Sequence, residues 1–219
     1  MNHDITELFC FADDFCKAFD VETAKYRLSQ NSRKPTRVPG LTSSKIITIL
    51  LMFQTSYMKN FKRFYLHCRE KYRAEFPGMP SYERFLALKP RVVPVLTALF
   101  MCLRRNDSNL AFVDSTPVRV CNNKRIFNHK VFKGIAERGK STVGWFFGFK
   151  LHLVIDEKGE IINAVLTPGN VNDRKPVEDL LSFFQGLVFG DKGYISKDMF
   201  ARLREKGIKL IAGLKKGDI

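Results

Sequence analysis

The sequence predicts an α+β protein in which an all-helical N-terminal part precedes a mixed β-sheet with flanking helices. Three observations lead to this prediction: helical spacing of apolar residues up to about residue 106, a polar stretch at residues 105–109, and strand patterns from residue 110 onward. A hydrophobic content of 45%, with 12% aromatic residues, indicates a chain that folds. We therefore expect two domains, residues 1–106 and residues 107–219.

Turn-forming residues divide the first domain. The apolar spacing predicts five helices, over residues 4–19, 46–58, 61–73, 81–87 and 91–104. Thr42 and the two serines after it are suited to cap the second helix, and Ser81 is suited to cap the fourth. Pro90 separates the last two helices, since a proline cannot donate a backbone hydrogen bond.

The second domain switches to strand patterns that alternate with short helices. The predicted strands cover residues 110–114, 145–156, 161–167, 187–190 and 208–213, and the predicted helices cover residues 176–184 and 197–206. A Lys158-Gly159 turn joins the second and third strands as a hairpin. This order matches the ribonuclease H-like fold, although other α/β folds share much of it.

Charge and composition limit the class of partner. A formal net charge of +15 favours a polyanion, and nucleic acid fits better than a membrane surface. The longest apolar run, residues 46–53, is interrupted by Thr48, so we expect no bilayer-spanning segment and no membrane partner. Asp4 and Glu7 occupy the region where a signal peptide carries positive charge, and five scattered cysteines indicate reduced thiols. We therefore expect a cytoplasmic protein.

Two aspartates each follow a short apolar strand. Asp114 comes after residues 111–113, and Asp191 comes after residues 187–190. The ends of adjacent strands can bring two carboxylates close enough to share divalent ions, and Mg²⁺ prefers such hard oxygen ligands. Taken singly, each aspartate is better explained as a turn-capping residue.

Taken together, four stretches resemble insertion-sequence transposases with a DDE active site. The motifs are VDSTPV at residues 113–118, GFKLHL at 148–153, TPGNVND at 167–173 and GDKGY at 190–194. The segment PSYERF at residues 80–85 is similar to one in the insertion-sequence group numbered nine-eight-two. The resemblance covers nearly the whole chain and implies a bacterial mobile element with a ribonuclease H-like catalytic domain.

The resemblance implies that Asp114 and Asp191 are the first and second catalytic aspartates and that both bind Mg²⁺ or Mn²⁺. The family's third ligand is a glutamate on a helix after the fifth strand, and only residues 214–219 follow that strand here. We therefore expect a catalytic domain that is incomplete at its C-terminus, from a truncated or frameshifted reading frame. Glu205 precedes the strand and is interpreted as a surface residue.

Three further residues are candidates for the active site. Asp173 matches a recurrent family position, and a turn-forming role is an equal alternative. Lys150 and His152 share one face of a strand, from which His152 could approach the scissile phosphate. A hydrogen-bonded histidine within the sheet is the favoured alternative for His152.

Two basic stretches are candidates for DNA binding. Between Ala24 and Arg73 the only acidic residue is Glu70, and the aromatic residues interleaved with the cations are interpreted as core. A second basic stretch lies between the first two predicted strands and is either a DNA contact or a solvated, partly mobile insertion. The residues singled out are Lys59, Lys62, Arg63, Arg69, Lys71, Arg73, Lys130 and Lys133.

Three functions remain in competition. The first is a metal-dependent transposase that cleaves and transfers strands of double-stranded DNA, at transposon ends and target, as a homo-oligomer. The second is a catalytically inactive truncated transposase that binds DNA as a remnant or inhibitor. The third is a hydrolytic ribonuclease H-like nuclease, which does not account for the basic helical domain.

Overall fold

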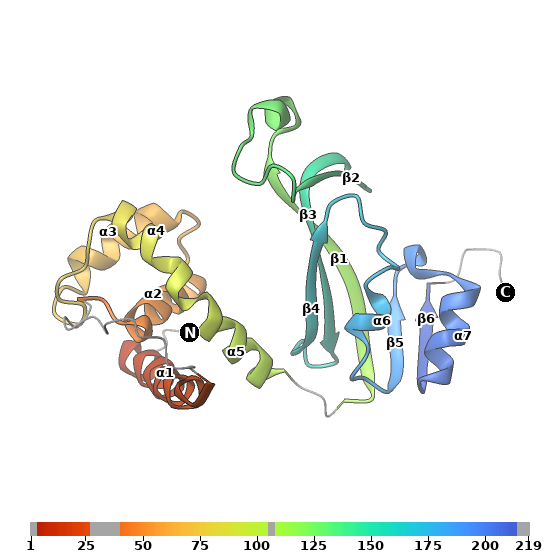
Figure 1. Cartoon of the computed structure of the whole chain (residues 1–219), viewed down its shortest axis with the longest axis horizontal. Helices are drawn as coiled ribbons and strands as arrows, with labels where there is room; N and C mark the ends of the chain where they lie inside the picture. Colours follow the sequence, from red (N-terminus) through yellow and green to blue (C-terminus); the bar gives the residue numbers. More distant parts are fainter. Residues whose placement is uncertain (1–3, 27–39, 105–107, 214–219) are drawn as a thin grey trace. The chain divides into compact units, whose positions relative to one another are not determined.

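The chain divides into two units, Met1–Cys102 and Leu103–Ile219, each described by itself. The structure is a computed structural model that describes residues 4–26, 40–104 and 108–213 (Figure 1). The expected domain boundary at residue 106 lies outside the described residues.

The first unit is helical. Its elements are α1 (Ile5–Tyr26), α2 (Ser43–Thr55), α3 (Phe61–Lys71), α4 (Tyr82–Leu88), the 3₁₀ turn η1 (Lys89–Val92) and α5 (Val93–Leu103). Thr42 and Ser81 accept hydrogen bonds from backbone N–H groups three residues further on, which confirms both predicted caps. Asn60 caps α3 in the same way, accepting from the Arg63 N–H at 3.0 Å.

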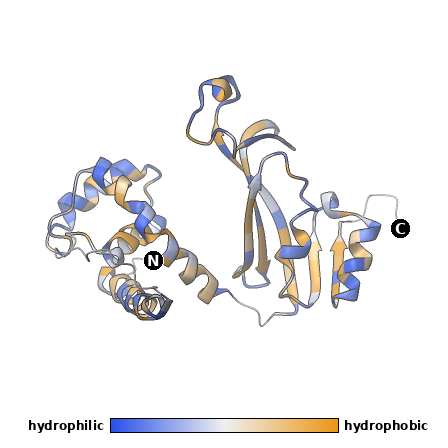
Figure 2. Cartoon of the chain, viewed as in Figure 1, coloured by the Kyte–Doolittle hydropathy of each residue, from blue (hydrophilic) through white to orange (hydrophobic). Residues whose placement is uncertain are grey.

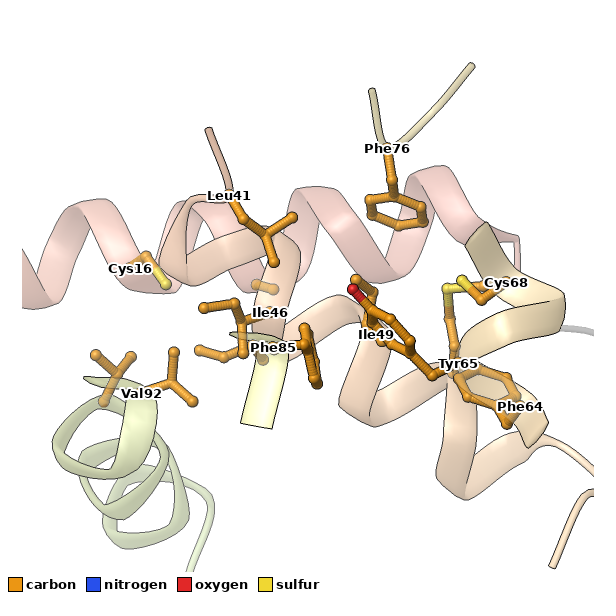
Figure 3. Packing of buried hydrophobic residues seen from close by; sticks show 14 residues of the cluster. Cys16, Leu41, Ile46, Ile49, Phe64, Tyr65, Cys68, Phe76, Phe85 and Val92 are labelled. Carbon is orange, nitrogen blue, oxygen red and sulfur yellow. The ribbon is translucent and has the colours of Figure 1, made fainter. Parts of the chain in front are cut away.

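Aromatic packing connects α3 to α4 in this unit (Figure 3). The rings of Tyr65 and Phe85 lie 4.6 Å apart between centroids, and both side chains are fully buried with Ile46 and Ile49 of α2. Burial raises the pKa of Tyr65 to about 12, and its hydroxyl donates a 2.9 Å hydrogen bond to the Pro80 carbonyl. This bond fixes the turn that leads into α4.

One helical stretch passes a length and composition test for a membrane span that the longest apolar run, residues 46–53, did not suggest. Residues Tyr82–Leu103 form a helical stretch of 22 residues, and an 18-residue window within it has a mean hydropathy of 1.7, so by length and composition alone the stretch could cross a membrane. Pro90 does not break the stretch, because it lies in the first turn of η1, where a missing N–H is tolerated. Val92 and Val95 pack into the core of the helical unit.

The second unit is a six-stranded mixed sheet with helices on one face. Its elements are β1 (Leu110–Cys121), η2 (Asn123–Asn128), β2 (Glu137–Ser141), β3 (Gly144–Asp156), β4 (Ile161–Pro168), α6 (Val177–Leu180), β5 (Gly186–Gly190), η3 (Lys192–Tyr194), α7 (Lys197–Glu205) and β6 (Ile208–Ala212). β3 pairs antiparallel with β1, β2 and β4, whereas β5 is parallel to β1 and β6 is parallel to β5. An antiparallel meander extended by two parallel strands is the ribonuclease H-like arrangement, as predicted.

Three details of the sheet differ from the sequence-based expectation. β1 continues past Asp114 to Cys121, because its second half pairs with β3 alone and needs no apolar pattern. β2 was not predicted at all; its residues are mostly polar, and β3 holds them in place by backbone pairing. The helix expected over residues 176–184 is only the single turn α6.

One apolar layer joins the helices to the sheet. Met199 and Leu203, one helical turn apart on α7, pack with the β5 residue Val188 and the β6 residue Ile208. Figure 2 shows the apolar strands β5 and β6 beside the mixed surface of α7. This layer holds β5 against β1.

We expect Leu203→Ala to lower the free energy of unfolding of the sheet unit by about 2–5 kcal/mol, because Leu203 is fully buried and its truncation leaves a cavity. Urea titration followed by the emission of Trp145, which lies in this unit, would measure it. The matched control Leu166→Ala removes a side chain that is 56% exposed and should cost no more than about 0.5 kcal/mol. Equal losses for the two variants would contradict this packing.

Candidate active site

The register between β1 and β5 places the two predicted catalytic aspartates side by side. The parallel pairing runs from Leu110 opposite Leu187 to Val113 opposite Gly190. Asp114 and Asp191 are the next residues on the two strands, at the carboxyl end of that pairing. The sequence predicted that the strand ends at Asp114, and this prediction was wrong. Asp114 lies where β1 leaves β5, and it remains paired with β3 opposite Leu153.

Both carboxylates are exposed and make a local hydrogen bond. Asp114 Oδ1 accepts from the Ser115 backbone N–H at 2.7 Å, and Asp191 Oδ1 accepts from the Lys192 N–H at 2.6 Å. The second bond caps η3. A turn-capping aspartate makes such bonds, and in each residue Oδ2 has no hydrogen-bond partner among the described residues.

Asp114, Asp173 and Asp191 line one open pocket of about 290 Å³. Tyr194, which follows Asp191 in the same motif, lines its wall. Much of the remaining wall comes from the β2–β3 hairpin, which contributes Lys140, Ser141, Thr142, Val143 and Phe146. The structure thus brings four of the predicted site residues, Asp114, Lys150, Asp173 and Asp191, together with a hairpin that the sequence did not reveal.

Lys150 holds Asp173 at the edge of this pocket. Its Nζ donates to Asp173 Oδ1 and to the Val171 carbonyl, each at 2.9 Å. The Lys150 side chain is only 11% exposed, so its ammonium depends on these two acceptors. Asp173 is therefore partly neutralised, unlike Asp114 and Asp191.

His152 lies beneath the pocket region, fully buried within the sheet. Its Nε2 shares a 2.9 Å hydrogen bond with Thr167 Oγ1 of β4, and Nδ1 has no partner among the described residues. Burial lowers the pKa of His152, Lys150 lowers it further, and the Asp173 carboxylate acts in the opposite direction. The imidazole is therefore neutral at physiological pH.

Tyr194 is the buried polar group that sequence reasoning missed. Burial is the largest cause that raises its pKa to about 12, and Asp173, Asp114 and Asp191 raise it as well. Among the described residues its hydroxyl has no partner with hydrogen-bond geometry, although the Ser115 side chain lies close enough to lower the pKa. The tyrosine in the residue 190–194 motif was the only sequence signal for it.

The donor set suits a hard divalent cation. Asp114 and Asp191 offer carboxylate oxygens, and Mg²⁺ binds through one or two carboxylates while keeping several waters. Within the described ranges, no three His, Cys, Asp or Glu side chains gather closely enough to enclose a metal. The residues present therefore fit a two-carboxylate site that is open to solvent. Glu205 is exposed on α7 and does not line the pocket.

The predicted DNA-binding cations all lie at the surface of their own unit. The exposed set on and beside α3 comprises Lys59, Lys62, Arg63, Arg69, Lys71 and Arg73. Lys130 and Lys133 are exposed on the connection between β1 and β2, the green arm in Figure 1. Arg27, Arg33, Lys34 and Arg37 of the first basic stretch lie outside the described residues, as do residues 214–219.

Residues 104–218 match the family described as "Transposase DDE domain". The chain belongs to this family. The comparison with curated proteins found no significant match.

Several solved structures resemble the transposase chain. A piggyBac transposase synaptic complex with hairpin DNA shares 12% identity at a TM-score of 0.41, over 98% of this chain and 48% of that one. The Mos1 strand transfer complex shares 10% identity at a TM-score of 0.30, over 93% of this chain and 68% of that one. A simian T-cell lymphotropic virus intasome shares 13% identity at a TM-score of 0.31, over 59% and 44%. The chain thus spans about half the length of the first and last of these.

We expect the sheet unit to lose stability as the pH falls below 6.5. Since the folded pKa of His152 lies below its ordinary value of 6.5, the unfolded chain binds a proton in this window that the folded chain does not. The contribution of neutral His152 to the free energy of unfolding is fully present above pH 6.5 and is lost as the pH falls toward the folded pKa of His152. Urea unfolding at pH 7.5 and 5.0 would measure the loss, which should be smaller in His152→Gln and unchanged in His129→Gln. The same loss in His152→Gln as in the parent chain would refute the assignment.

Proposed function

We propose that this chain is a transposase that cleaves and joins DNA strands, with Asp114 and Asp191 as the ligands of Mg²⁺ or Mn²⁺. The observation that carries the proposal is the β1–β5 register, which sets both carboxylates at one edge of the sheet and in one pocket. Membership of the transposase DDE domain family supports it. The hard oxygen donors of the two aspartates agree with this choice of metal.

The residues around the pocket have different roles in binding the cation and in orienting the reacting groups. Asp114 and Asp191 would hold the cation, and each is oriented by a hydrogen bond from a backbone N–H group, that of Ser115 and that of Lys192 respectively. A divalent cation, when bound, supplies Lewis acidity toward a phosphate oxygen and lowers the pKa of a water. Lys140 on the rim presents a positive charge to the scissile phosphate, and Lys150 fixes Asp173.

The proposed reaction has two in-line displacements at phosphorus. In the first, a water oxygen attacks the phosphate, loses its proton, and displaces the 3′ oxygen of the neighbouring nucleotide as a free hydroxyl. In the second, that 3′-hydroxyl loses its proton and attacks a phosphate of the target DNA, whose own 3′ oxygen is displaced and leaves as a hydroxyl, so that the two strands are joined. The exposed pocket suits this chemistry, because a duplex must reach the carboxylates from solvent.

The biological setting is part of the proposal. The substrates would be double-stranded DNA at transposon ends and at the target, bound by a homo-oligomer in the bacterial cytoplasm. The PSYERF segment supports membership of insertion-sequence group nine-eight-two. In this segment Ser81 caps α4 and Phe85 is fully buried, so the motif has a structural role in the helical unit.

A second candidate function is DNA binding without catalysis. It is favoured by the pairing of Asp173 with Lys150, which leaves two unpaired carboxylates in the pocket where the family uses three acidic ligands. A chain of this kind would occupy transposon ends and inhibit a complete enzyme. The two candidates differ in whether strands are cut.

The nicking of supercoiled plasmid DNA in Mg²⁺ or Mn²⁺ distinguishes them. We expect Asp114→Asn to lower the nicking rate by more than about 100-fold, since removing one group that stabilises developing charge has effects of this size. Asp198→Asn, which changes an exposed aspartate on α7, is the matched control and should nick like the parent chain. Nicking by Asp114→Asn at the parent rate would exclude this site. DNA binding without nicking by the parent chain would establish the second function.

The basic surface of α3 gives a separate prediction. We expect the double variant Lys62→Gln/Arg69→Gln to bind duplex DNA more weakly and to flatten the plot of log affinity against log salt by about 0.9 for each phosphate that is no longer neutralised. The control Lys17→Gln removes an exposed cation that is paired with Asp13, so it should leave the slope unchanged. Fluorescence anisotropy of a labelled duplex between 50 and about 200 mM salt would measure both. An unchanged slope in the double variant would remove these residues from the DNA-binding surface.

A further inference from the structure

The β2–β3 hairpin carries the only tryptophan of the chain, Trp145, with two cations over its ring. The Arg138 guanidinium carbon lies 5.1 Å from the ring centroid, and Lys140 Nζ lies 5.9 Å from it. Lys140 is the cross-strand partner of Trp145 in the β2–β3 register, so all three side chains share one face of the hairpin. Trp145 nevertheless remains 53% exposed.

The backbone under this face is held firmly. The Asn123 amide donates a 2.8 Å hydrogen bond to the Trp145 carbonyl, and the Ser141 hydroxyl donates a 3.1 Å bond to the Gly144 carbonyl across the turn. On the opposite side of β2, Gly139 lies against Gly169, so closely that a Cβ on Gly139 would be 2.0 Å from the Gly169 oxygen. The indole is therefore presented by a fixed strand rather than by a free loop.

The charges on this face have no acidic partner. None of the ion pairs among the described residues includes Arg138 or Lys140. An exposed indole with two unpaired cations is the composition that binds single-stranded nucleic acid, in which aromatic rings stack on bases and cations contact phosphates.

The position of the hairpin indicates which strand it would meet. Lys140 belongs both to this cluster and to the wall of the carboxylate pocket, to which Ser141, Thr142 and Val143 of the same turn contribute. A DNA strand whose phosphate lies at Asp114 and Asp191 would therefore also pass close to the indole of Trp145. Bases inside a duplex are already stacked on their neighbours, so only an unpaired base can use the indole.

We propose that Arg138, Lys140 and Trp145 form a platform that stacks an unpaired base of the DNA strand next to the carboxylate pocket. The indole receives the base, and the two cations contact the flanking phosphates. The inference rests on the proposed function, which identifies the bound strand as the DNA that is cleaved. It adds a subsite that binds an unpaired base near the cleavage point.

The test uses the full chain and two oligonucleotides, a blunt 20-base-pair duplex and the same duplex with a five-nucleotide single-stranded overhang. Because Trp145 is the sole tryptophan, its emission reports the platform directly. We expect saturable quenching by the overhang duplex and none by the blunt duplex. In anisotropy measurements with labelled DNA and no metal, Trp145→Ala should weaken overhang binding about tenfold and leave blunt-duplex binding unchanged, whereas Trp145→Phe should retain most of the affinity.

The matched control is Phe183→Ala, which removes another exposed aromatic, 68% exposed, under Arg104 but remote from the pocket lining. It should bind both DNAs like the parent chain. Equal weakening of blunt and overhang binding by Trp145→Ala, or no weakening, would overturn the platform while leaving the proposed function intact. Failure of the parent chain to bind either DNA would overturn both. Circular dichroism melting would show that each variant is folded.

Discussion

The parallel pairing of β1 with β5 is the constraint on which the candidate site depends. Four backbone pairs, from Leu110 opposite Leu187 to Val113 opposite Gly190, fix the relative height of the two strands. Ala111, Val113 and Val188 are buried under the helices, and a shift by one residue would turn them to the other face. The same register sets the positions of Asp114 and Asp191, so the core that stabilises the sheet also aligns the carboxylates.

Much of this arrangement could be predicted from the sequence, because four of the strands consist mainly of apolar residues. β3, β4, β5 and β6 are such strands. The second half of β1 lacks a clear apolar pattern and β2 is mostly polar; both are strands because they pair with the β3 backbone, which is distant in the chain for β1 and directly across a hairpin turn for β2. The continuation of α4 into α5 escaped prediction for a local reason, since Pro90 suggests a break where the structure has a tolerated first turn.

The candidate site was predictable only where a residue type signals its own chemistry. Asp114 and Asp191 follow apolar strands, which makes them possible ligands for hard cations, and the resemblance of the four motifs singled them out from other turn-capping aspartates. The pocket wall was not predictable, because Lys140 reaches it through pairing of β2 with β3. Gly169 of the TPGNVND motif has a comparable explanation: it lies so close to the Glu137 carbonyl that a Cβ would approach to 2.7 Å. That motif therefore carries a packing requirement of β2 as well as the acidic residue Asp173.

The Lys150–Asp173 pair connects the stability of the sheet to the chemistry of the pocket. An ammonium that is 11% exposed requires close acceptors, and Asp173 and the Val171 carbonyl supply them. Releasing Asp173 to bind a cation would leave Lys150 with one neutral acceptor and a like charge nearby. That rearrangement is unfavourable while Lys150 stays buried, so the fold itself favours a site built on Asp114 and Asp191, with Asp173 as the residue that secures the lysine beside them.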